Sequence, residues 1–147
     1  MESDGLLLEH LSRHECMRLM GSVPVGRIVY TRQALPAVEL VNFTLDDGEI
    51  VMRTDAGGKL AAATRGAVVA FEADSLDPVS QSGWSVTVVG NSRAVTDIEE
   101  IRRLQQVTPT PWAPGEHDHF IRVSAVFVTG RRIESKTVSG ENDARHT

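Results

Sequence analysis

Residues 25–54, VGRIVYTRQALPAVELVNFTLDDGEIVMRT, determine the predicted fold class. β-Branched and aromatic residues dominate three runs within them, at residues 25–31, 37–45 and 49–54. Such runs favour strands. A turn at residues 33–36 separates the first two runs, and Asp47-Gly48 supplies the positive φ angles of a tight hairpin before the third. The stretch therefore predicts three consecutive strands joined by turns.

The rest of the chain adds short helices and further strands. Helices are expected at residues 12–20, 60–64 and 98–107, with Ser12 and Asp97 as N-caps and Gly21 as a C-cap. Strands are expected at residues 67–73, 84–89, 93–96, 120–128 and 131–134, with a bend at Gly90-Asn91. Strands in runs, without βαβα alternation, predict a mainly β fold: an antiparallel sheet of roughly six strands closed into a small barrel, with helices outside it.

Composition places the chain among ordinary globular proteins. It has 147 residues, 41% hydrophobic and 24% charged, which is the size of one domain. Lys and Arg number 15 against 20 Asp and Glu, so the net charge is −5, which argues against a nucleic-acid partner. The single cysteine, Cys16, excludes an internal disulfide and is expected to be buried and inert.

The two ends are expected to lie outside the folded domain, which would span residues 12–134. Residues 1–11 are expected to be flexible, and the polar residues 135–147 to form a disordered tail. The acidic start and the lack of a long apolar run predict no export signal and no membrane segment, which favours a cytoplasmic protein.

Residues 53–59, RTDAGGK, combine two glycines with side chains that bind anions. Glycines let a backbone approach a ligand, and Arg53, Thr54 and Lys59 could hold phosphate oxygens. The alternative is a plain strand-to-helix turn with solvated charges.

Two tryptophans mark further candidate segments. Trp84 opens a strand after Gly83, where an indole could cover a planar ligand, although an ordinary core anchor would look the same. Trp112 lies among the prolines of residues 108–115, a pattern typical of a binding or subunit-contact loop, or of a cap on the barrel end.

No catalytic set accompanies these segments. His117 and His119 lack a third ligand at a suitable spacing, so no metal site is predicted, and no nucleophile motif occurs. A phosphate clamp without acid–base residues favours a cofactor that brings its own reactivity.

Eight motifs lie in register along the chain. They are Val25-Gly26-Arg27, Leu40-Val41-Asn42-Phe43, Asp47-Gly48, Arg53-Thr54 with Gly58-Lys59-Leu60, residues 69–74 (VAFEAD), residues 83–90 (GWSVTVVG), Pro111-Trp112-Ala113-Pro114-Gly115 and residues 128–133 (VTGRRI). Together they resemble the motifs of the pyridoxamine 5′-phosphate oxidase-like flavoproteins, the FMN-binding split β-barrel family. The chain looks most like the nitroimidazole-reductase-like branch.

The resemblance implies a six-stranded split barrel that forms a homodimer, with FMN sites at the interface. Carried over by position, Arg53, Thr54 and Lys59 would hold the FMN phosphate. Val41 and Asn42 would lie along the isoalloxazine ring, mainly through backbone groups.

Four more residues complete the implied site. Trp84 and Ser85 occupy a position where the family contacts the cofactor from the next strand. Trp112 and Arg131 are candidates for the partner subunit's contribution. Leu40 stands where the branch often has proline.

The expected function is that of an FMN-dependent oxidoreductase, which transfers a hydride or electrons between flavin and a small planar substrate. Arg53 or Lys59 would stabilise negative charge on the ring, and the tryptophans would exclude solvent. One alternative is a non-catalytic flavin or haem carrier or redox sensor, and another is a reductase that uses a deazaflavin coenzyme.

Overall fold

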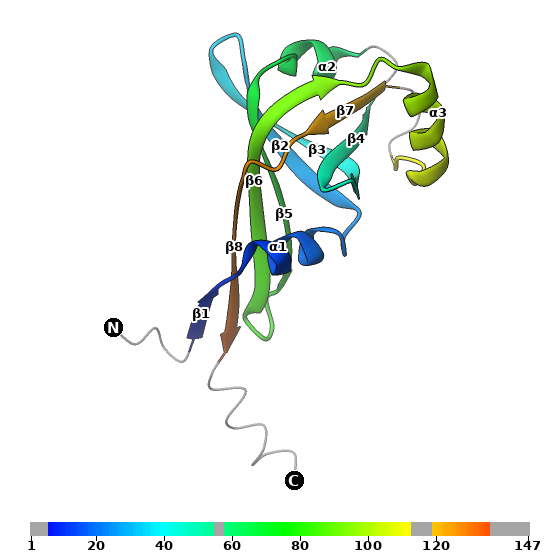
Figure 1. Ribbon diagram of the computed structural model, residues 1–147. Helices are drawn as coiled ribbons and strands as arrows, with labels where there is room; N and C mark the ends of the chain where they lie inside the picture. Colours follow the sequence, from blue (N-terminus) through cyan, green and yellow to red (C-terminus); the bar gives the residue numbers. More distant parts are fainter. Residues whose placement is uncertain (1–5, 55–57, 113–118, 136–147) are drawn as a thin grey trace.

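The computed structural model describes residues 6–54, 58–112 and 119–135 as eight strands and three helices (Figure 1). In chain order these are β1 (Leu6–His10), α1 (Arg13–Met20), β2 (Val25–Arg32), β3 (Leu35–Asp46), β4 (Glu49–Thr54), α2 (Lys59–Thr64), β5 (Val68–Asp77), β6 (Ser82–Ala94), α3 (Ile98–Val107), β7 (His119–Val123) and β8 (Phe127–Ser135). Within these residues no helix is both long and apolar enough to cross a bilayer.

Six strands form a closed antiparallel barrel. Their order is β6-β5-β2-β3-β4-β7, and pairing of β7 back to β6 closes the ring. Ile28, Phe71 and Ile121 are fully buried inside it, because inward-facing apolar residues alternate with outward ones along each strand. The predicted mainly β fold, a six-stranded antiparallel barrel with peripheral helices, is confirmed.

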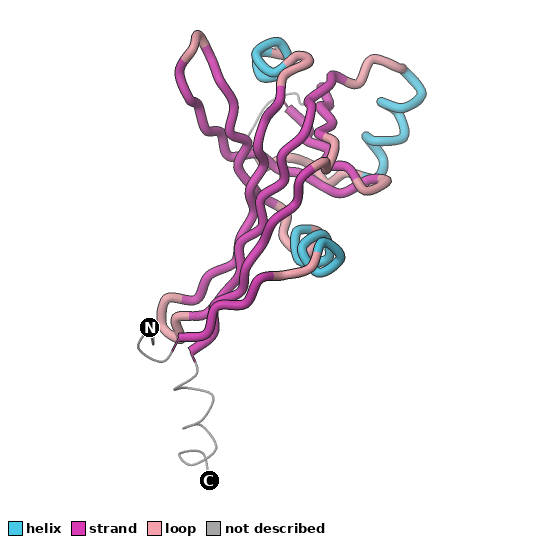
Figure 2. Tube along the Cα trace, turned by 60° about the vertical axis from the view of Figure 1, so that its left-hand side comes forward, coloured by secondary structure: helices cyan, strands magenta, loops and turns pink. Residues whose placement is uncertain are grey.

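Strands β5 and β6 continue beyond the barrel, where β8 pairs with β6 and β1 pairs with β8. These four strands form an extended sheet, which we call the stem (Figure 2). The predicted connection at residues 74–83 is shorter than expected, because β5 runs on to Asp77 and pairs with β6 as far as Ser82. Strand β6 pairs with β8 along the stem and with β7 at its far end.

The expected strand at residues 120–128 is interrupted where the chain changes from one pairing to the other. β7 ends at Val123 and β8 begins at Phe127. Gly90 lies opposite this crossing, and a Cβ there would stand 1.6 Å from the carbonyl oxygen of Ser124. Glycine is therefore required at the predicted bend, since any side chain would collide with backbone.

Helix α1 covers one face of the stem and begins as predicted. The Ser12 hydroxyl accepts the amide hydrogen of Glu15 at 3.2 Å, and Cys16 is fully buried, as expected. The prediction of a flexible segment at residues 1–11 is wrong for Leu6–His10, which forms β1 on β8. An unpaired edge of β8 supplies the partner that local composition does not show.

Candidate functional site

The barrel is split along β3, and this creates a cleft. Phe43–Asp46 pairs with β4, whereas residues 35–42 pair only with β2 among the described strands. The outer edge of this segment leaves backbone N–H and C=O groups available to a ligand. A cleft of about 280 Å³ lies beside it, lined by Tyr30, Arg32, Glu39, Leu40, Val41, Asn42, Arg53, Thr54, Lys59, Leu60 and Pro111.

One end of the cleft carries the predicted anion-binding residues. Arg53 and Thr54 end β4, and Lys59 begins α2 after Gly58, whose φ of +63° favours glycine. The Arg53 guanidinium lies 5.5 Å from the centre of the Phe120 ring and donates to the Thr108 hydroxyl at 3.5 Å. The structure thus brings Arg53, Thr54 and Lys59 to one cleft, as the sequence pattern predicted.

The segment after α3 forms one wall of the cleft. Thr108 follows the helix, Pro111 lines the cleft, and the Trp112 amide donates to Oδ1 of Asn42 at 2.9 Å. The side-chain nitrogen Nδ2 of Asn42 donates to the carbonyl oxygen of Pro24 at 3.3 Å. The Asn42 side chain therefore fixes this wall, and the backbone groups at the outer edge of β3 stay available to a ligand. The Trp112 side chain is 71% exposed, and residues 113–115 of the predicted loop lie outside the described part.

Sequence reasoning missed three other residues that line the cleft, Tyr30, Arg32 and Glu39. The β2–β3 register pairs Tyr30 with Ala37 and Ile28 with Glu39, so these side chains share the inward face of the barrel wall. Burial, with the charge of Glu39 as a further cause, raises the pKa of Tyr30 above its usual value. The sequence signal that could have revealed these residues is Glu39, a glutamate at an inward position of a strand.

Three predicted site residues lie on the stem, away from the cleft. Trp84 pairs with Arg132, which donates to Glu15 of α1 at 3.2 Å, so Trp84 faces α1 and packs against the core. Ser85 pairs with Arg131 on the opposite face of the stem. Within one chain, therefore, Trp84 lies partly buried against the core, and Ser85 and Arg131 lie on a separate, open face.

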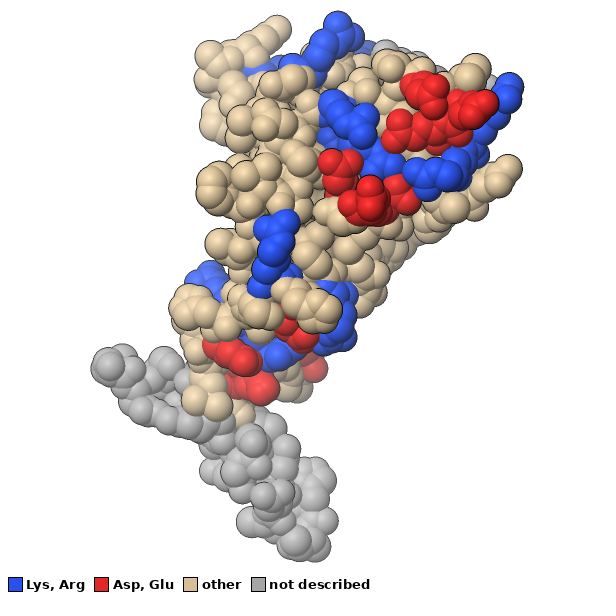
Figure 3. All heavy atoms as spheres, in the orientation of Figure 1, with Lys and Arg blue, Asp and Glu red and all other residues tan. Residues whose placement is uncertain are grey.

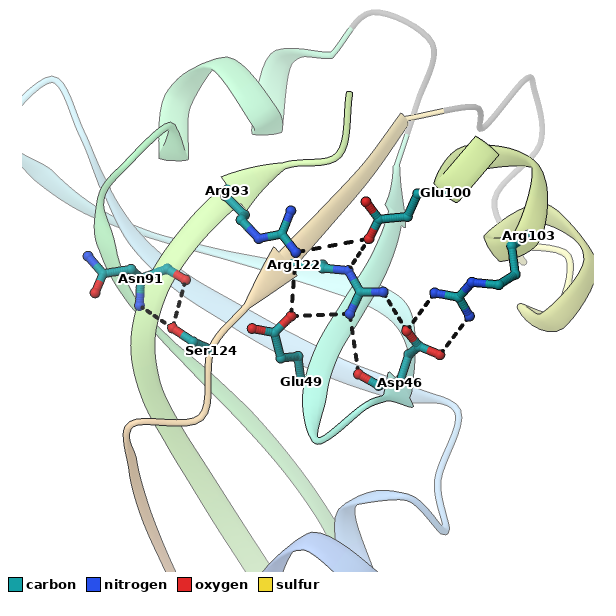
Figure 4. Close-up of polar contacts among 8 residues, drawn as sticks. All are labelled: Asp46, Glu49, Asn91, Arg93, Glu100, Arg103, Arg122 and Ser124. Carbon is teal, nitrogen blue, oxygen red and sulfur yellow. Dashed lines mark hydrogen bonds and ion pairs between the residues drawn. The ribbon is translucent and has the colours of Figure 1, made fainter. Parts of the chain in front are cut away.

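A network of alternating charges holds α3 against the barrel. Its members, which we call the charge network, are Asp46, Glu49, Arg93, Glu100, Arg103 and Arg122 (Figure 4). Figure 3 shows the acidic and basic side chains gathered at this end of the molecule.

Arg122 is the centre of the charge network. It is only 4% exposed, and it donates to Glu100 at 2.7 Å and to Glu49 at 3.1 Å. Arg103 of α3 donates two hydrogen bonds of 3.0 Å to the carboxylate of Asp46. Together with Arg122, it holds the pKa of Asp46 well below its usual range. Since α3 leads into the wall at Thr108, the charge network also positions the cleft.

The cleft can therefore accept a molecule with an anionic group, a flat apolar body and hydrogen-bonding atoms along one edge. A profile of the pyridoxamine 5′-phosphate oxidase family matches residues 12–132. The chain belongs to this family. The uncharacterized protein Rv0080 of Mycobacterium tuberculosis is 43% identical to this chain over 128 residues, which is 84% of each chain.

Two solved structures share the fold and part of the sequence. The FAD binding protein from Mycobacterium smegmatis is 34% identical with a TM-score of 0.66, over 86% of this chain and 98% of that one. A proposed pyridoxamine 5′-phosphate oxidase from Corynebacterium glutamicum is 30% identical with a TM-score of 0.76, over the same shares of both chains. Among the described residues no group of three His, Cys, Asp or Glu side chains could hold a metal ion.

Proposed function

We propose that the cleft binds FMN and that the protein is a flavin-dependent oxidoreductase acting on a small planar molecule. The observation that carries this proposal is the free edge of β3 beside a cleft with Arg53, Thr54 and Lys59 at one end. Family membership and a relative that binds FAD, at 34% identity, support a flavin over other phosphorylated ligands.

The residues of the cleft match the parts of FMN. Cationic and hydroxyl groups of Arg53, Thr54 and Lys59 suit a phosphate. Leu40, Val41 and Leu60 offer apolar contact to a flat ring between the two polar ends. The backbone of Val41 and Asn42 would meet the polar atoms of that ring, since this stretch of β3 has no strand on its outer side among the described residues.

When bound, FMN would supply hydride or electron transfer, which amino-acid side chains do not provide. The chain's own residues would bind the phosphate and orient the ring against β3. Trp112 and Pro111 would limit the access of water to the cleft from the side of α3.

We also propose a homodimer that covers the outer face of the sheet. One apolar row crosses that face, because each of its residues pairs with the next on the neighbouring strand. The row runs from β3 through β2, β5 and β6 to β8 and consists of Val38, Val29, Ala70, Val89 and Phe127. Val38 is 62% exposed and Phe127 68%. A continuous exposed apolar row is typical of a subunit interface.

The dimer would account for Ser85 and Arg131, which lie on the same outer face as Phe127 because β8 alternates its side chains. In a dimer this face would lie against the second subunit, next to its cleft. Leu40 belongs to both the face and the cleft, which places the two features side by side.

Titration of the purified protein with FMN tests the proposal. We expect saturable quenching of flavin fluorescence, and rapid oxidation of the bound, reduced flavin by a quinone or nitroaromatic compound. Binding with only slow reaction with oxygen would favour a carrier or sensor. No saturable binding of FMN, FAD or a deazaflavin coenzyme would contradict a flavin site.

FAD is the second candidate cofactor, because the 34% identical relative from Mycobacterium smegmatis is an FAD binding protein. Denaturing the purified protein and chromatographing the released pigment would separate the two flavins.

A further inference from the structure

The cleft also holds a second polar group, formed by Tyr30, Arg32 and Glu39. The Tyr30 hydroxyl donates to Oε1 of Glu39 at 3.4 Å, and Tyr30 is 5% exposed. Arg32 lies near enough to Tyr30 for its charge to act on the phenol. All three side chains line the cleft.

The three side chains share one face of the strands. Ile28, Tyr30 and Arg32 occupy alternate positions on the inward face of β2, and Glu39 stands opposite Ile28 on β3. Ile28 is fully buried in the apolar core, whereas Arg32 and Glu39 are exposed. Both charged groups line the cleft, so they are accessible to a polar ligand there.

The stretch of β3 beside the cleft is long enough for a fused ring. Glu39 and Asn42 are three residues apart on an extended strand, which is roughly 10 Å. Because Arg53, Lys59, Glu39 and Arg32 all line the same cleft, a flat heterocycle with its phosphate near Arg53 and Lys59 could lie along this strand beside Glu39 and Arg32.

We infer that Glu39 and Arg32 recognise the imide edge of the bound flavin ring, with Tyr30 as the residue that positions Glu39. The imide presents one N–H between two carbonyl oxygens. Glu39 can accept the hydrogen bond of the N–H, and Arg32 can donate to a neighbouring carbonyl. This inference rests on the proposed flavin site and adds the residues that read the ring.

A ligand without the imide N–H tests this assignment. The dissociation constants of FMN and of its analogue methylated at the imide nitrogen are compared for the wild-type protein, and for Glu39→Ala, Tyr30→Phe and Glu99→Ala. Glu99 is an exposed acid on α3 and does not line the cleft, so its variant is the matched control.

We expect the wild-type protein and Glu99→Ala to prefer FMN by roughly tenfold or more, the range of a hydrogen bond to a charged group. Glu39→Ala should bind both ligands alike, and Tyr30→Phe should show a reduced preference. A general loss of stability would not change this ratio, since it affects both ligands equally.

Equal binding of both ligands by the wild-type protein would overturn the inference and leave the flavin site standing. A preference that survives in Glu39→Ala would also overturn it. If the wild-type protein binds neither ligand, the proposed flavin site itself is wrong.

Discussion

Lys59 lies on the rim of the cleft at the start of α2, and its side chain is exposed. Lys59→Ala should raise the dissociation constant of FMN by roughly tenfold to a hundredfold, because a charge-assisted hydrogen bond contributes about 1.5–3 kcal/mol. Binding of riboflavin, which lacks the phosphate, should change little. Isothermal titration with both ligands measures this.

Arg65→Ala provides the matched control for Lys59, since Arg65 is an exposed cation at the other end of α2 and does not line the cleft. An unchanged affinity for FMN in Lys59→Ala, or an equal loss for riboflavin, would remove Lys59 from a phosphate site.

Glu72 on the outer face of the sheet titrates unusually. The Arg27 guanidinium lies 3.0 Å from the carboxylate of Glu72 and 3.3 Å from that of Asp74. Burial and the neighbouring Asp74 nevertheless raise the pKa of Glu72 to about 7. The folded state therefore holds a proton on Glu72 that the unfolded state releases near pH 4.5. The contribution of Glu72 to stability is complete below that pH and is lost as the pH rises to about 7.

The comparison of wild-type protein with Glu72→Gln at pH 5 and pH 8 measures this effect. The wild-type protein should lose stability relative to the variant between the two pH values, by thermal unfolding. A difference that stays constant, or that moves in the wild-type protein's favour at pH 8, would contradict the raised pKa.

Helix α3 is held by Arg122 as well as by its own apolar residues. Leu104 packs on Val51 and Phe120, while Glu100 and Arg103 join the charge network. Arg122→Met would leave three carboxylates without their buried partner, so we expect a loss of about 3–5 kcal/mol in the free energy of unfolding.

Urea unfolding of Arg122→Met, beside Arg18→Met, tests the role of the charge network. Arg18 pairs with Glu15 on the exposed side of α1, so its loss should leave the unfolding midpoint unchanged. Equal midpoints for the two variants would show that the charge network does not hold α3.

Local patterns were enough to place most elements, because caps, turns and apolar runs act over a few residues. The caps Ser12 and Asp97 begin helices as predicted. Pairing between distant strands could not be predicted from local patterns. Strand β1 forms because β8 offers an edge, and the chain breaks after Val123 because it changes strand partners opposite Gly90.

The cleft could be predicted only in part, for the same reason. Arg53, Thr54 and Lys59 lie close in sequence, and their motif showed them together. Tyr30 and Glu39 meet through the β2–β3 register, which no local motif records. The parity of β6, which turns Trp84 towards α1, likewise depends on strand pairing that no local motif records.

The whole molecule exposes an apolar row that a second copy would cover. Phe127→Glu places a charge on this row and should give a monomer, which sedimentation would detect. The monomer should also bind FMN more weakly, which titration with FMN would measure. Val79→Glu is the control, because Val79 is 94% exposed in the β5–β6 turn and lies outside the row. A Phe127→Glu protein that sediments like the wild-type protein would contradict an interface on this face.

Native mass spectrometry of the purified protein after incubation with FMN tests the flavin cleft and the dimer together. We expect one dominant species, with two chains and two FMN molecules, and we expect Lys59→Ala to lower its flavin content. A flavin-free protein under these conditions, or a monomer that binds FMN as tightly as the dimer, would contradict this expectation.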